Sequence, residues 1–161
     1  MKHILCKTTT SSVSFQNLSD DQIQPNAIDL KVKTISKLQP GTVVLNGKEQ
    51  RHLPSTIVES ENGLYHLSPG KYDVVFDGEV TIGDNEAGFL ITRSTLNRNG
   101  IIITSGLYDS GYNNIIGGML HIPEGTHLAI GEHERLAQFL LFDAEMIHRY
   151  DGDYNRVTTE G

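Results

Sequence analysis

GLYDSGYNNIIGGML, the stretch Gly106–Leu120, places a polar turn between two apolar runs of the chain. Three isoleucines at 101–103 precede it, and two more at 115–116 follow the turn. β-Branched residues on both sides of a Gly- and Asn-rich turn are typical of a β-hairpin. The stretch therefore predicts two antiparallel strands, with the carboxylate of Asp109 and the ring of Tyr112 in the turn that joins them.

Similar strand-like segments continue in both directions from this hairpin. NAIDLKVKTI alternates from Ala27 to Ile35, and a Ser-Pro-Gly turn at 68–70 precedes the apolar run at 74–76. Turn residues recur roughly every 8 to 14 positions, and no helix-length segment separates the strands as a βαβ unit would require. The pattern predicts an all-β fold, either a barrel or a jelly-roll-like sandwich.

Helical signals are confined to one short segment. SDDQIQ, residues 19–24, offers Ser19 as an N-cap and acidic residues in the first turn. The chain has no internal repeat and no linker, so we expect a single domain over residues 1–161, long enough to bury its own core. Residues 150–161 are polar and lose the apolar periodicity, which predicts a mobile C-terminal tail.

The charge of the chain limits its partners. A formal net charge of -7 argues against a nucleic-acid-binding protein, which would present a basic face. It does not exclude a small anionic ligand, because a few well-placed arginines can hold phosphates on an acidic protein. Arg93 and Arg98 stand out in this respect, because basic residues are scarce in the sequence that follows them.

The cellular location is constrained by what the chain does not contain. No apolar run approaches the roughly 20 residues that span a bilayer, so we expect no integral membrane segment. The apolar patch near the N-terminus is too short for a secretory signal, and the lone Cys6 cannot form an internal disulfide. We therefore expect a reducing, cytoplasmic location.

Several kinds of catalytic site do not fit the sequence. A single cysteine excludes the zinc site of the nucleoside deaminases, and the seven histidines show no metal-binding spacing. No glycine-rich phosphate loop is present, and neither Ser94 nor Ser110 lies in a nucleophile elbow. The two glycines of IGGML, residues 116–120, predict either a β-bulge or a place where the backbone approaches another group closely.

Four segments, in their order along the chain, resemble the motifs of the superfamily that contains the trimeric dUTPases and the dCTP deaminases. The resemblance runs from about Ile23 to Asn155. The segments are IQPNAIDLKV (23–32), RSTLNRNG (93–100), GLYDSGYNNI (106–115) and HERLAQFLLF (133–142). The resemblance implies a jelly-roll-like homotrimer, with sites for a deoxynucleoside triphosphate between subunits.

The resemblance also implies a hydrolase. Asp109 would orient and deprotonate a water that attacks the α-phosphorus, which releases pyrophosphate and a deoxynucleoside monophosphate. A Mg²⁺ ion would be chelated mainly by the substrate phosphates and would need few protein ligands. Further roles carried over from the motifs concern substrate binding: triphosphate contacts by Arg93, Ser94, Arg98 and Gln138, support of that network by Asp29, sugar packing by Tyr112, and reading of the base by backbone around Gly117.

Features of both branches of the superfamily occur in the chain. Arg98 and RYDGDYN (149–155) are similar to deaminase motifs, and the arginine-bearing glycine-rich lid of the dUTPases is missing. A tail with Tyr150 and Tyr154 would then close over the nucleotide instead. Met119 occupies the place of the glutamate that deaminases use as a proton shuttle at the base, so the resemblance implies triphosphate cleavage without deamination.

Two alternatives to a dUTPase-like enzyme stay open. The missing lid also fits a protein that binds a deoxynucleoside triphosphate without cleaving it, in a regulatory role. A dCTP deaminase with an altered route is less favoured, because Met119 cannot transfer a proton and Glu124 is the nearest acid downstream. Base recognition by backbone groups leaves little side-chain signature, so the sequence does not select one base.

Overall fold

The hairpin that Gly106–Leu120 predicts is present in the structure, a computed structural model that describes residues 1–47 and 49–156. Strand β9 (Ile102–Thr104) pairs antiparallel with β10 (Asn113–Ile122), and Thr104 lies opposite Met119. The turn residues between these strands form the long connection that carries the third motif. The prediction of a strand–turn–strand unit is confirmed.

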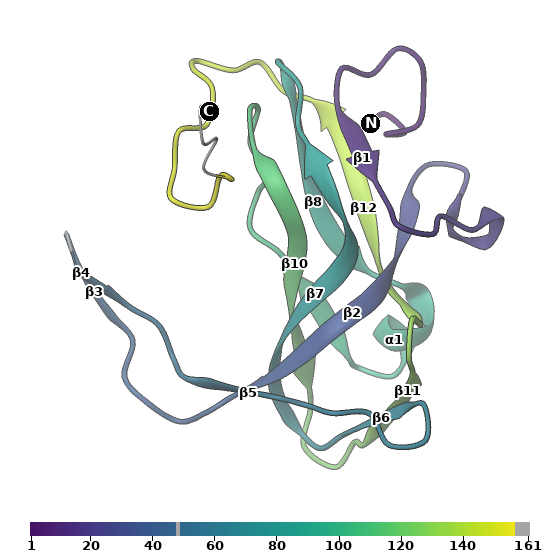
Figure 1. Ribbon diagram of the computed structural model, residues 1–161, viewed down its shortest axis with the longest axis vertical. Helices are drawn as coiled ribbons and strands as arrows, with labels where there is room; N and C mark the ends of the chain where they lie inside the picture. The colour runs from purple at the N-terminus through teal and green to yellow at the C-terminus, as the bar shows by residue number, and fades with distance from the viewer. Residues whose placement is uncertain (48, 157–161) are drawn as a thin grey trace.

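The hairpin is one part of an eight-stranded antiparallel sheet (Figure 1). Its path runs in the order β8–β12–β2–β7–β10–β9, so neighbouring strands come from distant parts of the chain. Two short strands pair at the side of this path, β1 with β7 and β5 with β2. Bounds not given above are β1 (Ser12–Ser14), β2 (Ile28–Leu38), β5 (Ser55–Ile57), β7 (Gly70–Thr81), β8 (Glu86–Thr92) and β12 (Arg135–Asp143).

The two ends of the path, β8 and β9, meet through side chains and one backbone bridge. Thr92 Oγ1 accepts a hydrogen bond from the Ile103 N–H at 2.8 Å and donates one to the Ile103 carbonyl at 3.0 Å. Just beyond β9, the backbone of Gly88 exchanges hydrogen bonds of 2.9 and 2.7 Å with that of Tyr108. The sheet is therefore nearly closed into a barrel, which confirms the all-β prediction.

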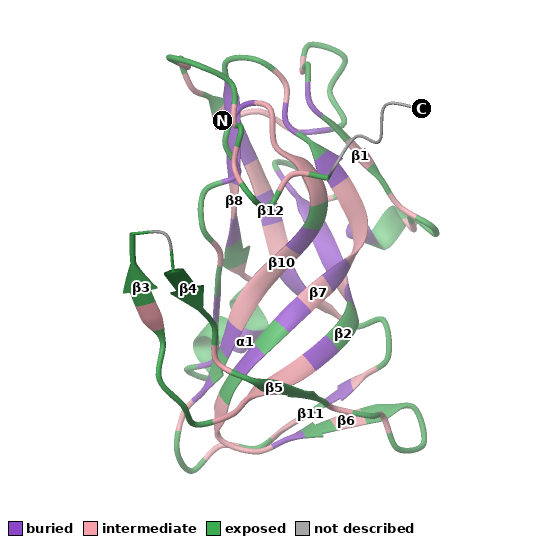
Figure 2. Ribbon diagram, turned by 60° about the vertical axis from the view of Figure 1, so that its left-hand side comes forward, coloured by how far each residue is buried: buried purple, intermediate pink, exposed green. Residues whose placement is uncertain are grey.

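Side chains that alternate along β7 help to fill the core of the barrel. On β7, Tyr72, Val74 and Phe76 are buried, whereas Lys71 and Asp73 face outward. Alternate residues of a strand point to opposite faces of a sheet, so one face supplies the core and the other remains available for a site. Figure 2 shows this alternation as buried and exposed bands along part of β7.

Two small two-stranded sheets lie outside the main sheet. β6 (Leu64–Leu67) pairs with β11 (Leu128–Gly131) at one end of the barrel. β3 (Val44–Asn46) and β4 (Glu49–Arg51) form an arm that projects away from the barrel and is largely exposed (Figures 1 and 2).

The helical expectations are half right. A 3₁₀ helix at Asp20–Gln22 follows Ser19, as SDDQIQ predicts. The Ser19 N–H donates a hydrogen bond of 3.1 Å to Oε1 of Gln22. A second helix, α1 (Ser94–Arg98), is a correction to the expectation of strand and turn beyond that segment. Five residues are too few for an amphipathic pattern, and the helix is held by burial of Leu96.

Glu86, at the start of β8, fixes the N-terminal segment to the barrel. Its buried carboxylate accepts hydrogen bonds from the N–H groups of Thr10 (3.1 Å) and Ser11 (2.8 Å), from the Ser11 hydroxyl, and from Lys2 (3.0 Å). Burial alone would raise the pKa of this carboxyl, but the donors together lower its pKa to about 2.

We expect a Glu86→Gln variant to be less stable than the parent by about 3 kcal/mol at neutral pH, since the pKa is lowered from 4.5 to about 2. A lowered pKa stabilises the fold above the unfolded-state value, and this contribution is lost as the pH falls from 4.5 toward 2. Urea unfolding at pH 7, 4 and 3 measures the gap between the two proteins, which should narrow with acid. A gap that stays constant with pH contradicts this account.

Candidate nucleotide-binding site

Three residues from three of the four motifs meet around one buried carboxylate. Asp29, on β2, is 1% exposed, and its Oδ1 accepts a hydrogen bond from Gln138 Nε2 on β12 at 3.0 Å. Its Oδ2 lies 2.9 Å from Nε of Arg93, which follows β8 directly. The structure thus brings Asp29, Arg93 and Gln138 together. Because the carboxylate orients both partners, it can set the position of groups that bind phosphate.

Arg135 is a further member of this cluster that the sequence analysis did not select. Its Nη1 lies 3.4 Å from Asp29 Oδ2, and its carbonyl accepts a hydrogen bond of 3.0 Å from Arg93. Alternation alone would place Arg135 and Gln138 on opposite faces of β12. A register shift between Arg135 and Ala137 marks a β-bulge that turns both side chains toward Asp29.

Helix α1 places the other two phosphate candidates beside the cluster. Arg93 is the N-cap of this helix, and Ser94 is its first residue. Ser94 and Arg98 are both exposed, so their side chains are accessible to a ligand. The second motif therefore presents one arginine bound to Asp29, one free hydroxyl and one exposed arginine on the same short element.

A cavity of about 740 Å³ lies on the outer face of β7 and β10 and holds the remaining substrate-binding candidates. Residues of the strands, of the loop after β9 and of the C-terminal segment line it. The candidates among them are Tyr112, Gly117, Tyr150 and Tyr154. Its apolar walls and few polar groups are typical of a small-molecule site.

The Tyr112 ring lies between two other tyrosines at this cavity. Its centroid is 5.0 Å from that of Tyr108 and 5.9 Å from that of Tyr150. Burial, with smaller contributions from the two neighbouring phenols, raises the pKa of Tyr112 to about 12. The phenol is therefore neutral at physiological pH, and it donates a hydrogen bond of 2.8 Å to the Ile115 carbonyl. This fixes the ring as an uncharged platform that a sugar can contact.

Tyr108 occupies the backbone groups that the sequence analysis assigns to base recognition. Its hydroxyl donates to the Gly117 carbonyl at 2.6 Å and accepts from the Gly117 N–H at 3.0 Å. Tyr108 itself was not selected as a candidate, although it neighbours Asp109 in the third motif. Gly117 therefore lies at the cavity as expected, but its N–H is already satisfied by this phenol.

Both interpretations of the IGGML glycines apply. The register of β10 against β7 shifts between Ile115 and Gly117, which is a β-bulge. A Cβ at Gly118 would lie 2.8 Å from the Thr104 carbonyl, so glycine is required for β9 to approach this closely. The glycines shape the cavity wall by allowing this approach.

The C-terminal segment lies against the same hairpin over the residues that the structure describes. The Tyr150 N–H donates to the Ser110 carbonyl at 2.7 Å, and the Asn114 side chain donates to the Tyr154 carbonyl at 2.8 Å. The Asn114 side chain thus helps to hold this segment against β10. Mobility of the tail stays a prediction, and residues 157–161 lie outside the described residues.

Asp109 lies in a second cavity, of about 520 Å³, that adjoins the first. The residue is exposed, and Tyr150 lines both cavities. An exposed carboxylate at the border of two cavities is accessible to a ligand and to water. Such a carboxylate can accept a proton from a water molecule that attacks a phosphorus atom.

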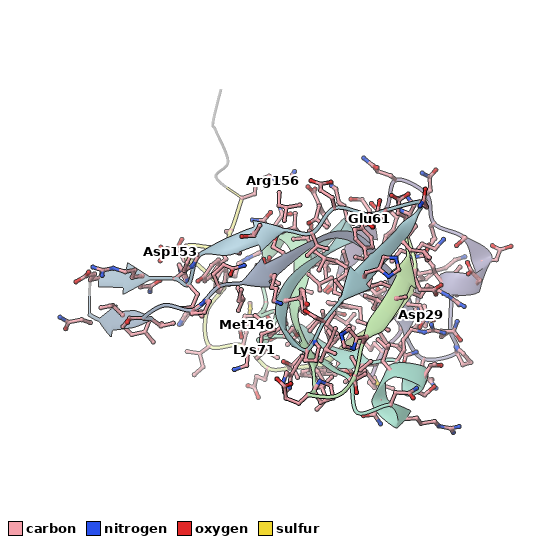
Figure 3. All side chains as sticks on the ribbon, turned by 90° about the horizontal axis from the view of Figure 1, so that it is seen from below. Asp29, Glu61, Lys71, Met146, Asp153 and Arg156 are labelled. Atoms are coloured by element: carbon pink, nitrogen blue, oxygen red, sulfur yellow. The ribbon has the colours of Figure 1, made fainter. Side chains whose placement is uncertain are left out.

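The cluster around Asp29 lies far from Asp109 within one copy of the chain. Tyr108 pairs with Gly88 near one end of β8, whereas Arg93 follows the other end, so the strand separates them by about 17 Å. In Figure 3, Asp29 lies on the opposite side of the barrel from Asp153 of the C-terminal segment. The cluster around Asp29 and the Asp109 carboxylate therefore lie in two separate places on one copy of the chain.

Residues 1–47 and 49–156 contain neither a group of potential metal ligands nor a helix that could span a membrane. No three His, Cys, Asp or Glu side chains gather there into a group that could hold a metal ion. No helix in this part of the chain is long and apolar enough to cross a membrane. The cytoplasmic location stays a prediction.

Comparisons with known proteins place the chain in a family. A family model described as dCTP deaminase-like matches residues 2–144. A probable deoxyuridine 5′-triphosphate nucleotidohydrolase of Methanopyrus kandleri is 32% identical, over 88% of this chain and 93% of its own length. The deoxyuridine 5′-triphosphate nucleotidohydrolase of Methanocaldococcus jannaschii is also 32% identical, over 90% of this chain and 94% of its own length.

Solved structures share the fold at lower identity. The dUTPase of EIAV superposes with a TM-score of 0.56 and 14% identity, covering 92% of this chain and all of its own. A 2′-deoxycytidine 5′-triphosphate deaminase from Agrobacterium tumefaciens superposes with a TM-score of 0.61 and 14% identity. The superposition covers 80% of this chain and 43% of the deaminase chain. The motif order, the barrel and the family match agree: the chain belongs to the dCTP deaminase-like family, within the superfamily of dCTP deaminases and dUTPases.

Proposed function

We propose that the protein hydrolyses dUTP to dUMP and pyrophosphate. The observation that carries this proposal is the position of Asp109. This residue of the third motif is an exposed carboxylate next to the tyrosine-lined cavity. The curated relatives with 30–32% identity over most of the chain are named deoxyuridine 5′-triphosphate nucleotidohydrolases, which supports the same reaction.

In the proposed mechanism, Asp109 acts as the general base. It orients a water molecule in line with the α-phosphorus and takes its proton as the bond to the bridging oxygen breaks. The new P–O bond gives dUMP, and pyrophosphate leaves. Tyr112 packs on the deoxyribose, where its ring leaves little room for a 2′-hydroxyl, and the segment with Tyr150 and Tyr154 covers the nucleotide.

The phosphate half-site, Asp29 with Arg93, Ser94, Arg98 and Gln138, would complete the active site from a second copy of the chain. Because β8 separates the two half-sites of one copy by about 17 Å, a single triphosphate does not reach from Asp109 to Arg93 of the same copy. A head-to-tail arrangement that closes as a ring brings each half-site to a neighbour. We propose a homotrimer on this basis, as the family resemblance implies.

A divalent cation fits this arrangement. Mg²⁺ keeps most of its water and prefers phosphate and carboxylate oxygens, so a phosphate-bound ion needs little from the protein. Asp109 supplies an exposed carboxylate near the expected phosphates. When bound, the ion would neutralise charge on the phosphate oxygens, while Arg93 and Gln138 would position the triphosphate.

A nucleotide panel tests the proposed function. We expect pyrophosphate release from dUTP in the presence of Mg²⁺, about a hundredfold or more faster than from dCTP or dTTP, and none after chelation by EDTA. Coupled pyrophosphate detection measures the rates, and chromatography identifies dUMP. Tight binding of dUTP without turnover would favour the regulatory alternative, and ammonia release from dCTP would favour a deaminase.

A further inference from the structure

The tyrosine-lined cavity contains one charged side chain, which no motif accounts for. Among the described residues that line the cavity, only Asp73 is charged. It lies on β7, directly opposite Met119 of β10, and Met119 in turn lies opposite Thr104 of β9. Cross-strand neighbours project from the same face of a sheet, so these three side chains form one row across the cavity wall.

The direction of the Asp73 side chain follows from the strand pattern. Tyr72 and Val74, its neighbours in β7, are buried in the core, whereas Asp73 and Val75 line the cavity on the other face. Protein atoms around the open cavity displace enough water to raise the pKa of the Asp73 carboxyl above its ordinary value, although the residue is exposed. Burial is the cause of this rise.

Three other polar side chains of the cavity have partners among the described residues. Ser105 Oγ accepts from Leu90 N–H and donates to the Gly106 carbonyl, and the Tyr112 phenol bonds Ile115. Tyr108 bonds both backbone groups of Gly117. Burial raises the pKa of Tyr108, and the nearby charge of Asp73 raises it further. The Asp73 carboxylate lines the cavity and can accept a hydrogen bond from a ligand close to the backbone groups expected to read a base.

We infer that Asp73 is a specificity-determining residue that accepts a hydrogen bond from the ring N3–H of the uracil base. This inference rests on the proposed function. An ionised carboxylate only accepts hydrogen bonds, and N3–H is the one ring donor on the pairing edge of uracil. The carboxylate also repels phosphates, so it disfavours a nucleotide bound with its triphosphate against Asp73.

Binding of two nucleotide analogues tests this inference. The probes are α,β-imido-dUTP, which resists cleavage, and the same compound methylated at N3. With Mg²⁺, we expect the parent protein to bind the methylated probe about tenfold to a hundredfold more weakly, because the methyl group removes the donor. In Asp73→Ala this ratio should fall to about threefold or less. Calorimetry with the full chain measures both affinities.

Two further variants make the result specific. Asp77→Ala removes a carboxylate from the same strand outside this cavity, and it should keep the parent's discrimination. Asp73→Val places a residue that strands favour, and that has no hydrogen-bond acceptor, at the same position, and it should lose discrimination as Asp73→Ala does. Thermal unfolding confirms that each variant is folded.

The outcomes separate the inference from the proposed function. Discrimination that persists in Asp73→Ala and Asp73→Val overturns the role of Asp73 and assigns the N3–H to a backbone carbonyl of the cavity wall. Failure of the parent protein to bind α,β-imido-dUTP overturns the proposed function, and the inference falls with it. Loss of discrimination in both Asp73 variants, with Asp77→Ala unchanged, supports the inference.

Discussion

An Asp109→Asn variant is expected to release pyrophosphate from dUTP about a thousandfold more slowly than the parent protein, because an amide cannot take a proton from the attacking water. The change keeps the size and shape of the side chain. Asp109 is exposed and lies outside the buried core, so the variant should unfold at the same temperature as the parent.

The kinetic pattern distinguishes a general base from a binding residue. Loss of a group that acts in the transition state lowers kcat and leaves KM nearly unchanged, whereas loss of a ground-state contact raises KM. Steady-state rates at saturating dUTP and Mg²⁺ give both constants. An Asp109→Asn variant with the parent's kcat would remove the proposed mechanism.

Glu124→Gln is the matched control for this change. It also converts a carboxylate to an amide, but Glu124 lies in an exposed turn after β10 and lines neither cavity. We expect its kcat and KM to equal those of the parent. A similar loss in both variants would point to a general effect of charge rather than to proton transfer by Asp109.

The barrel could be predicted from the sequence because its signals are local. Alternation along β7 and the Gly- and Asn-rich turn before β10 each specify a strand without reference to the rest of the chain. Helix α1 could not be predicted in this way. It has five residues, and it depends on burial of Leu96 against distant strands, which is a tertiary effect.

The candidate site was predictable where the motifs name a residue. Asp29, Arg93 and Gln138 were selected from the resemblance, and in the structure their side chains are in contact. Arg135 joins them only because a β-bulge changes the direction of its side chain relative to Gln138 on β12. No pattern in the sequence predicts that bulge. The roles of all four residues in catalysis stay predictions.

The acid at the cavity wall shows a different limit of sequence reasoning. A search along the chain from Met119 finds Glu124 as the nearest downstream acid, but the cavity contains Asp73, a residue 46 positions earlier on the neighbouring strand. Strand pairing, not sequence distance, places that carboxylate beside Met119. A single motif therefore cannot predict which side chains from a paired strand lie beside it.

Mixing two inactive variants should restore activity if each active site is shared between two copies of the chain. Asp109→Asn disables the hairpin half of a site, and Arg93→Ala disables the phosphate half. After joint unfolding and reassociation at equal amounts, about one quarter of the sites in a head-to-tail ring combine an intact hairpin half with an intact phosphate half. Each variant alone should have almost no activity.

The same experiment contains its own control, because two lesions in one half cannot complement each other. A mixture of Asp109→Asn with Tyr112→Ala should stay at the level of the separate variants, since both residues belong to the same hairpin. Gln138→Ala can replace Arg93→Ala as the phosphate-half variant. It leaves Arg93 and Arg135 to pair with Asp29, which avoids an unpaired buried carboxylate.

Recovery in the first mixture and not in the second requires that Asp109 and Arg93 act on one triphosphate from different copies. The separation of the two half-sites along β8 leads to the same expectation. If mixed oligomers form, as a tag on one variant would verify, but activity stays absent, then both halves act within one copy. In that case β8 and α1 would have to shift to bring Arg93 toward Asp109, and the shared site would be wrong.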